Sequence, residues 1–160
     1  MSKFETERLL MRKIKPDDAE GLKEYALYKV SSGYEAWENW PTDQEGSKKL
    51  AEHLADKDNY WSVIRKSDFK FIGFISFNEV DDKSNLDMGH GFISEYNNDG
   101  EAVEAIKKMI QYAFDSLDIE AIDARNPEEW KEKVAPLKKI GFKRVDENRL
   151  QMTRDKWNSL

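Results

Sequence analysis

The stretch NLDMGHGFISEYNNDGEAVEAIKKMIQYAFDSL, residues 85–117, decides the fold of this chain. Its first part, residues 86–94, is short and rich in apolar residues and glycine, which predicts a strand. A polar turn follows at 97–100. Apolar residues then recur with the i, i+3, i+4, i+7 spacing of a helix that faces a core, at 102, 105, 106, 109, 110, 113, 114 and 117. A strand that leads into a helix N-terminus places backbone N–H groups at the end of a sheet, a geometry suited to binding phosphate.

The elements on either side of this stretch predict a single mixed α/β domain over residues 1–160. We expect further strands at 7–14, 60–65, 71–77, 119–124, 142–145 and 150–153. We expect further helices at 16–30, 44–55 and 127–140. The three strands between residues 60 and 94 follow one another closely enough for an antiparallel meander. The strand–helix–strand unit 86–124 requires its two strands to be parallel and adjacent.

The last helix carries two further predictions. Asn126 is expected to be its N-cap, with Pro127 at the first helical position. Pro136 lies inside this helix and is expected to kink or split it, because proline cannot donate the backbone hydrogen bond.

The composition narrows the class of protein. The 160 residues carry a net charge of −6 and no cysteine. An acidic chain argues against nucleic acid or an anionic membrane as a partner. The lack of cysteine excludes disulfides and thiolate nucleophiles, and two distant histidines, His53 and His90, do not support a zinc site. There is no apolar leader and no run of membrane-spanning length, so we expect a cytoplasmic protein without a metal ion.

Four motifs occur in order along nearly the whole chain. They are ETERLLMRKIKPDDAEGL at 5–22, FIGF at 71–74, DMGHGFI at 87–93 and KIGF at 139–142. In this order and spacing they resemble the GNAT acyltransferase superfamily, in particular the branch that contains ribosomal-protein alanine N-acetyltransferases. The resemblance implies a single-domain GNAT-like α/β fold, with a central mixed and twisted sheet of about six or seven strands and about four flanking helices.

The resemblance also implies a function. Acetyl-CoA is expected between the strands 86–94 and 119–124, which splay apart, with its pantetheine against the backbone of Phe92 and Ile93. The acetyl group is expected to pass directly to a primary amine of a small molecule or a protein N-terminus, without a covalent enzyme intermediate. A general base removes a proton from the ammonium, and strand backbone polarises the thioester carbonyl. A homodimer is left open as the assembly.

The loop expected to hold the pyrophosphate departs from the family pattern Gln/Arg-x-x-Gly-x-Gly/Ala. The six aligned residues are Asn97, Asn98, Asp99, Gly100, Glu101 and Ala102. Gly100 and Ala102 match the pattern and allow close approach of the backbone to a phosphate. Asp99 and Glu101 would repel a phosphate about 5 Å away by roughly 1 to 3 kcal/mol, which is similar in size to the attraction of the helix terminus. As an alternative, Asn98 and Glu101 form a capping box that needs no ligand.

The late helix departs from the family pattern as well. Where relatives commonly carry Asn-x-x-Ser, this chain has Trp130-Lys131-Glu132-Lys133. Leu137 stands where many relatives carry a tyrosine that protonates the leaving thiolate. Lys133 is a candidate to bind a phosphate or to stabilise the thiolate. The alternative is a solvated lysine on a charged helix.

Two catalytic candidates and two acceptor-site candidates complete the predicted site. Asp87 is a candidate base that acts through a water molecule, or else a residue that faces solvent at the end of a hairpin. His90 lies on the opposite face of the strand by alternation, and is either a base or a structural histidine. Trp37 and Trp40 either form a wall of the acceptor site or pin their loop onto the core.

These departures leave two functions open. The first is an acetyl-CoA-dependent N-acetyltransferase. The complete strand–turn–helix unit favours it, because backbone amides supply most phosphate contacts in such loops. The second is a catalytically weak or inactive GNAT-fold binding or regulatory module that has lost productive CoA binding. The altered loop and the missing tyrosine favour this second function.

Overall fold

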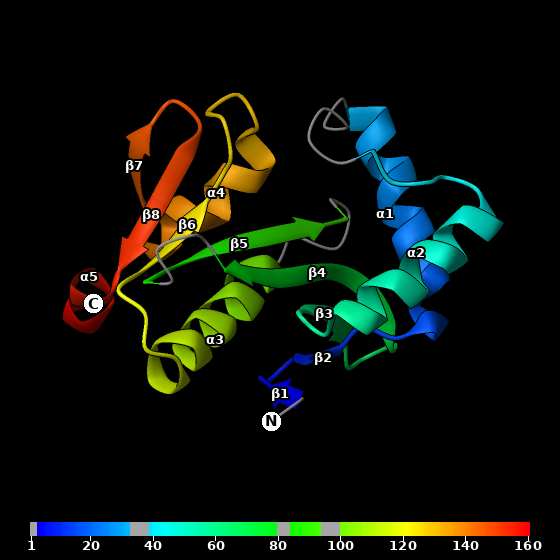
Figure 1. Ribbon diagram of the computed structural model, residues 1–160, viewed down its shortest axis with the longest axis horizontal. Helices are drawn as coiled ribbons and strands as arrows, with labels where there is room; N and C mark the ends of the chain where they lie inside the picture. Colours follow the sequence, from blue (N-terminus) through cyan, green and yellow to red (C-terminus); the bar gives the residue numbers. More distant parts are fainter. Residues whose placement is uncertain (1–2, 33–38, 80–83, 94–99) are drawn as a thin grey trace.

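The computed structural model describes residues 3–32, 39–79, 84–93 and 100–160. Within these ranges the strands form one mixed, eight-stranded sheet in the order β1-β2-β3-β4-β5-β6-β8-β7 (Figure 1). The strands are β1 (Lys3–Glu5), β2 (Leu9–Lys13), β3 (Tyr60–Arg65), β4 (Lys70–Glu79), β5 (Asn85–Phe92), β6 (Ala121–Ala124), β7 (Lys143–Asp146) and β8 (Arg149–Thr153). The helices are the short 3-10 helix η1 (Pro16–Asp18), then α1 (Ala19–Ser32), α2 (Gln44–Lys57), α3 (Glu101–Ser116), α4 (Lys131–Ile140) and α5 (Arg154–Ser159). This is the expected α/β architecture, with slightly more strands than predicted.

The strand–helix–strand unit predicted from the sequence stands in the middle of the sheet. Each strand from β1 to β4 pairs antiparallel with the next strand along the chain. The pairs β3–β4 and β4–β5 confirm the meander predicted between residues 60 and 94. β5 and β6 are parallel, with Leu86 opposite Ile122. Helix α3 connects these two strands, and a crossover of this kind requires the parallel arrangement. β8 and then β7 extend the sheet beyond β6 with antiparallel pairs.

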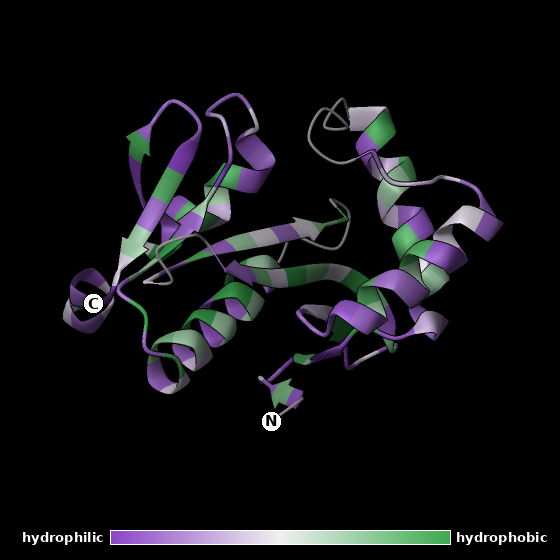
Figure 2. Ribbon diagram, in the orientation of Figure 1, coloured by the Kyte–Doolittle hydropathy of each residue, from purple (hydrophilic) through white to green (hydrophobic). Residues whose placement is uncertain are grey.

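Helices cover both faces of the sheet (Figure 1). α1 and α2 pack on one face, where Leu22 and Leu54 are buried. α3 and α4 pack on the other face, and Ile106 and Ile110 of α3 are fully buried there, as the periodicity predicted. Figure 2 shows the hydrophobic residues along β4 and α3. None of the helices in the described ranges is long and apolar enough to cross a membrane.

Two elements were not expected from the sequence. β1 is an edge strand that pairs Phe4 with Met11. α5 follows β8 directly, and the side chain of its N-cap Thr153 accepts a hydrogen bond from the Lys156 N–H. Arg154 fixes this short helix to the domain, because its guanidinium donates to backbone carbonyls at and beyond the end of α3, those of Phe114, Leu117 and Ile119.

α4 differs from the prediction at its start and at its proline. The helix begins at Lys131, and the Trp130 N–H donates to the Pro127 carbonyl over 3.1 Å in the turn before it. The prediction that Asn126 is the N-cap is therefore wrong. α4 also continues through Pro136, so the predicted split does not occur. Pro136 is buried together with apolar residues on both sides of it, and this packing holds the two turns together.

Candidate functional site

β5 has an unpaired edge in the middle of the sheet, next to β6. The pairing of β5 with β6 ends at Asp87 opposite Asp123, whereas β5 stays paired with β4 as far as Phe92. Beyond Asp87, no strand of the described residues therefore pairs with the β6 side of β5. We call this part of β5, residues 88–92, the open edge. It corresponds to the splayed pair expected between the strands 86–94 and 119–124.

Alternate residues of the open edge direct backbone polar groups away from β4. The Ile93 N–H donates to the Ile72 carbonyl over 3.0 Å, so at Ile93 these groups point to β4. Successive residues of a strand alternate in this direction, so the N–H and C=O of Phe92 and His90 point outward. A ligand that carries amide groups can pair with such an edge as an added strand. Of the two predicted pantetheine contacts, Phe92 thus presents its backbone to the open edge, and Ile93 does not.

The start of α3 lies at the predicted pyrophosphate loop. Gly100 is the N-cap, with φ 80°, in the left-handed region that favours glycine. An added Cβ would have Arg8 Nη2 as its nearest neighbour, at 3.9 Å, so the backbone conformation rather than lack of space requires glycine. The first N–H groups of a helix have no acceptor within the helix and can donate to a phosphate. The predicted Asn97, Asn98 and Asp99 lie outside the described residues.

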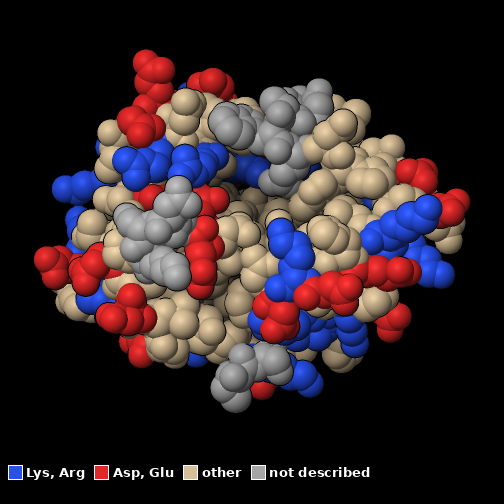
Figure 3. Space-filling model, viewed as in Figure 1, with Lys and Arg blue, Asp and Glu red and all other residues tan. Residues whose placement is uncertain are grey.

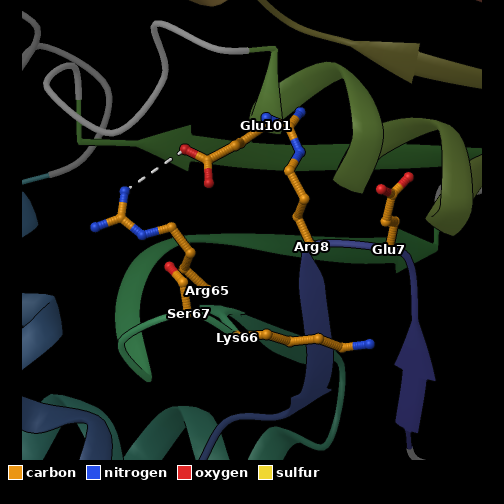
Figure 4. A pocket seen from close by; sticks show the side chains of 6 residues that line it. All are labelled: Glu7, Arg8, Arg65, Lys66, Ser67 and Glu101. Atoms are coloured by element: carbon orange, nitrogen blue, oxygen red, sulfur yellow. Dashed lines mark ion pairs between the residues drawn. The ribbon is translucent and has the colours of Figure 1, made fainter.

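Glu101 is the first residue of α3, and its side chain extends toward Arg65 (Figure 4). Glu101 is 4% exposed, and its carboxylate lies 3.8 Å from Arg65 Nη1. The two side chains line a cavity of about 510 Å³ together with Glu7, Arg8, Lys66 and Ser67. Because Gly100 is the N-cap, the predicted capping box of Asn98 and Glu101 is wrong. Arg65, which also pairs with Asp68 over 2.6 Å, offsets part of the charge of Glu101, so this carboxylate repels a phosphate at the helix start less than the sequence suggested. Ala102, the next residue, is fully buried.

The other basic residues of this cavity are also paired with carboxylates. Arg8 Nε lies 2.8 Å from Glu104 Oε1, and Lys66 Nζ lies 3.1 Å from Glu5 Oε1. Glu104 additionally accepts hydrogen bonds from the Arg8 N–H and from the Thr6 hydroxyl. This network holds the N-terminal segment against α3. Each basic residue of the cavity therefore has a carboxylate partner, and we assign the cavity no ligand.

His90 is buried on the side of the sheet that α3 and α4 cover. Its Nε2 lies 3.0 Å from Asn126 Oδ1, and because a carbonyl oxygen only accepts, the ring carries its proton on Nε2. Burial, and after it the positive charge of Lys133, lower the pKa of His90 to about 3, although the hydrogen bond to Asn126 opposes them. The ring is therefore neutral near pH 7 and a weak base. This favours a structural role for His90 over a catalytic one.

Lys133, a predicted cofactor contact, brings a positive charge near the open edge from α4. Its Nζ lies 5.7 Å from the centroid of the Trp130 ring, and its charge reaches His90. Leu137, where many relatives carry the tyrosine acid, is fully buried in the core. α4 therefore offers a cation in this region and no proton donor at the position of that tyrosine.

Asp87 lies at the last paired position of β5, where the open edge begins. Arg125 Nε donates to Asp87 Oδ1 over 3.2 Å, and the side chains of Arg125 and Asp87 are 55% and 26% exposed. Burial raises the pKa of Asp87 and the charge of Asp123 adds to this, while Arg125 opposes them, and the net direction is upward. A carboxylate with a raised pKa is a stronger base, as removal of a proton from an ammonium requires. Asp87 therefore fits the role of base better than His90.

An aromatic cluster lies between α1 and the sheet. The ring centroid of Trp40 lies 5.7 Å from that of Tyr25 and 5.0 Å from that of Phe74. The buried Lys29 places its Nζ 5.8 Å from the Trp40 ring. Trp40 is partly buried in this cluster, which fits both a binding wall and a loop pinned to the core. Trp37 lies outside the described residues.

The structure adds three residues that sequence reasoning missed. Asn126 bonds to the buried histidine, although the sequence suggested a helix cap. Arg125 pairs with the candidate base, and nothing in its local sequence indicates this. Tyr25 approaches β5 so closely that a Cβ at Gly91 would lie 2.2 Å from its hydroxyl oxygen. The Gly-x-Gly spacing at 89–91 is the signal that could have indicated such an approach.

Together these features define a class of protein. Two parallel neighbouring strands of a mixed sheet separate along part of their length, and the first of them leads into the N-terminus of a helix. The family model described as "Acetyltransferase (GNAT) domain" matches residues 8–143. The chain belongs to the GNAT acetyltransferase family. In the part of the chain that the structure describes, no group of His, Cys, Asp and Glu side chains could hold a metal ion.

Known proteins similar to this chain carry acetyltransferase names. It is 27% identical over 150 residues to "Uncharacterized N-acetyltransferase p20" of Bacillus licheniformis, which covers 90% of this chain and 84% of that protein. A GNAT-family acetyltransferase structure from Bacillus anthracis matches with a TM-score of 0.84 and 21% identity, over 96% of this chain and 99% of that chain. The ribosomal-protein-S5-alanine acetyltransferase from Vibrio fischeri matches with a TM-score of 0.75 and 20% identity, over 98% and 99% of the two chains. The microcin C7 self immunity acetyltransferase MccE, in complex with acetyl-CoA and AMP, has a TM-score of 0.75 and 18% identity over 92% and 93%.

Proposed function

We propose that this chain is an acyl-CoA-dependent N-acetyltransferase, which moves an acetyl group from acetyl-CoA to a primary amine by direct transfer. The observation that carries the proposal is the open edge of β5, which the chain continues into the N-terminus of α3. The strand edge offers partners for the amides of the pantetheine, and the helix start offers N–H donors for the pyrophosphate. The acceptor is a small-molecule amine or a protein N-terminus, and the compartment is the cytoplasm.

The residues of the site fit acetyl-CoA as the acetyl donor. His90 and Phe92 direct backbone N–H and C=O groups outward from the open edge. The segment Asn97–Ala102, with Gly100 as the N-cap of α3, is proposed to surround the pyrophosphate. Lys133 supplies a positive charge from α4. The acetyl-CoA bound to the structurally similar MccE supports this choice of donor.

Asp87 is proposed to act as the general base through a water molecule. Loss of the ammonium proton frees the amine nitrogen to attack the thioester carbonyl carbon. The C–N bond forms, the C–S bond breaks, and the thiolate departs with the electron pair. The second proton of the attacking nitrogen passes through water to the thiolate sulfur, which leaves a neutral amide and the CoA thiol. Backbone N–H groups of the open edge stabilise the negative charge that develops on the carbonyl oxygen. Lys133 stabilises the thiolate by its charge, because Leu137 offers no proton.

The acceptor is proposed to enter from the side of the sheet that α1 covers. Asp87 faces away from the buried His90 by strand alternation, toward the face on which Trp40 lies. Trp40, with Trp37, is proposed to form one wall of the acceptor site, since tryptophan offers a large and rigid contact area.

Thermal unfolding with and without acetyl-CoA tests donor binding. A ligand at 100 times its Kd stabilises the folded protein by about 2.7 kcal/mol, which raises the unfolding temperature measurably. Release of the CoA thiol in the presence of primary amines then tests transfer. No rise in the unfolding temperature at millimolar acetyl-CoA would rule out the transferase. Binding without thiol release for any amine would support the binding or regulatory module instead.

A further inference from the structure

Arg125 places the hydrogen-bond donors of its guanidinium next to Asp87, the proposed base. It directly follows β6, and its Nε donates to Asp87 Oδ1 over 3.2 Å. Among the described residues its terminal nitrogens Nη1 and Nη2 donate to no protein acceptor, and the side chain is 55% exposed. Asp87 Oδ2 likewise accepts no hydrogen bond from these residues. The pair therefore presents a guanidinium edge and a carboxylate oxygen side by side.

Two neighbouring arginines at this end of the sheet bond within the protein instead. Arg149 donates to Asp123 and to Asp146. Arg144 donates to Glu128 and to the backbone carbonyls of residues 126, 146 and 147. Figure 3 shows acidic and basic side chains intermixed over the face viewed, so a charged pair by itself is unremarkable here. Arg125 differs because, among the residues that the structure describes, a single one of its three nitrogens donates to a protein acceptor.

An amine that reaches Asp87 has the guanidinium of Arg125 beside it. A second positive charge on the acceptor is repelled at this place. A carboxylate on the same carbon as the amine is attracted, and it can accept two parallel N–H bonds from the guanidinium. From this juxtaposition we propose that the acceptor is a free α-amino acid, whose ammonium is linked to Asp87 by the bridging water molecule and whose carboxylate binds Nη1 and Nη2 of Arg125. The inference rests on the proposed transferase function and names its acceptor class.

The pair selects against two other classes of amine. A protein N-terminus carries a neutral peptide group where a free amino acid carries its carboxylate, and so offers Nη1 and Nη2 of Arg125 no carboxylate. A polyamine brings further ammonium groups toward Arg125. Asp87 acts on the reacting nitrogen through the water molecule in every case, so Arg125 is the specificity-determining residue and the α-carboxylate is the group that it recognises.

The test compares common L-amino acids with their α-amides as acceptors, using the full chain and acetyl-CoA. The amide keeps the amine and the side chain and removes the carboxylate charge. The amine of the amide is also less basic, so near pH 7 a larger fraction of it is in the neutral form that attacks the thioester. A preference for the free acid would therefore run against this difference in the amount of neutral amine. We expect kcat/KM for the preferred amino acid to exceed that for its amide by about tenfold or more, as for other charged hydrogen bonds.

Arg125→Gln is expected to bring the ratio of kcat/KM for acid and amide to about one, because glutamine has no charge and no fork of donors. The substitution also changes the surroundings of Asp87, but that change affects acid and amide alike. Arg149→Gln is the matched control, since Arg149 also pairs with a strand aspartate, and it should leave the ratio unchanged. Arg125→Lys keeps the charge without the fork, and its ratio should lie between those of wild type and Arg125→Gln. It also serves as the test variant if Arg125→Gln does not fold.

Three outcomes would overturn the inference while acetyl-CoA binding keeps the transferase proposal intact. They are equal use of acid and amide by the wild type, a preference that survives Arg125→Gln, and no transfer to any amino acid. A loss of the preference in Arg149→Gln as large as in Arg125→Gln would also overturn it, because the effect would then come from general charge. Absence of acetyl-CoA binding would overturn the proposed function and this inference together.

Discussion

His90 Nε2 donates to Asn126 Oδ1 over 3.0 Å, and this bond joins the open edge of β5 to the segment that follows β6. Both side chains are buried. The bond thus bridges the two strands beyond the point where their backbone pairing ends. A buried histidine with a depressed pKa makes the stability of this region depend on pH.

We expect the stability of the protein to fall as the pH falls from about 6.5 toward 3, with His90 as one cause. The pKa of His90 is about 3 in the folded protein and 6.5 in an unfolded chain, so between these values the unfolded state binds the extra proton. The contribution of His90 is fully present above pH 6.5 and is lost at about 1.4 kcal/mol per pH unit as the pH falls. Urea unfolding at several pH values measures this dependence.

His90→Gln should flatten this dependence on pH, because glutamine does not titrate. His53→Gln removes the other histidine, which is exposed on α2, and should leave the dependence as in wild type. Equal slopes for wild type and His90→Gln would contradict the depressed pKa of the buried ring.

The bond between His90 and Asn126 also shows how far the sequence predicts this structure. The strand, turn and helix at 85–117 were predictable, because hydrophobic periodicity reports which face of an element is buried whatever it packs against. Asn126 followed by Pro127 fits a helix start on local grounds. The Asn126 amide instead accepts a hydrogen bond from His90, 36 residues earlier in the chain, and the local sequence does not contain the position of this histidine.

The charges of the candidate site were less predictable for the same reason. Glu101 stands in the sequence where an anion was expected, yet its carboxylate turns to Arg65, which comes from a distant hairpin. Asp87 and Arg125 are 38 residues apart, and they meet because of the register of β5 on β6. The hydrophobic pattern specifies which face a strand buries, and it does not specify which charged residues become neighbours.

Asp87→Asn is expected to lower kcat by about 10²- to 10⁴-fold, the usual contribution of a general base. Binding of acetyl-CoA should change little, because Asp87 is proposed to act on the acceptor and not on the donor. The raised pKa of Asp87 places the acid limb of the wild-type pH–rate profile above 3.8, and activity should fall as the pH drops through it. The variant should lose this limb.

Steady-state rates of CoA release over a range of pH measure the effect of Asp87→Asn. Asp56→Asn, at an exposed position of α2, is the matched control and should behave as wild type. An Asp87→Asn variant that keeps both the wild-type rate and the acid limb would assign the base to another residue.

Gly100→Ala is expected to destabilise the fold by about 1 to 2 kcal/mol, because φ of 80° brings an added Cβ close to the next carbonyl oxygen. The substitution should also weaken acetyl-CoA binding, since relief of the strain alters the start of α3. Gly141→Ala introduces backbone strain at φ 125° beyond the end of α4, and should lower stability without weakening acetyl-CoA binding. Equal acetyl-CoA affinities of the two variants would remove Gly100 from the donor site.

Asp18 joins the start of the first helix to the sheet. Its carboxylate accepts hydrogen bonds from Arg12 Nη1 and Nη2 over 2.8 Å each, from Ser62 Oγ over 2.7 Å and from the Lys15 N–H over 3.0 Å. Burial alone would raise the pKa of Asp18, but the hydrogen bonds from Arg12, Ser62 and Lys15 outweigh it, and the pKa is lowered. The stability that this carboxylate contributes is therefore present above its unfolded pKa of 3.8 and is lost as the pH falls through the lower folded value.

Asp18→Asn is expected to lower the free energy of unfolding near pH 7 by about 2 to 4 kcal/mol, because it leaves Arg12 without its partner and replaces charged hydrogen bonds by neutral ones. Asp17→Asn, at the exposed neighbouring position of η1, removes the same charge and should change the free energy by less than about 0.5 kcal/mol. Denaturant unfolding of both variants near pH 7 and below pH 3 measures the difference. The deficit of Asp18→Asn should shrink at the lower pH, because the wild-type carboxylate then takes up its own proton. A deficit that stays constant with pH would mean that the shape of the side chain, and not its charge, holds η1 on the sheet.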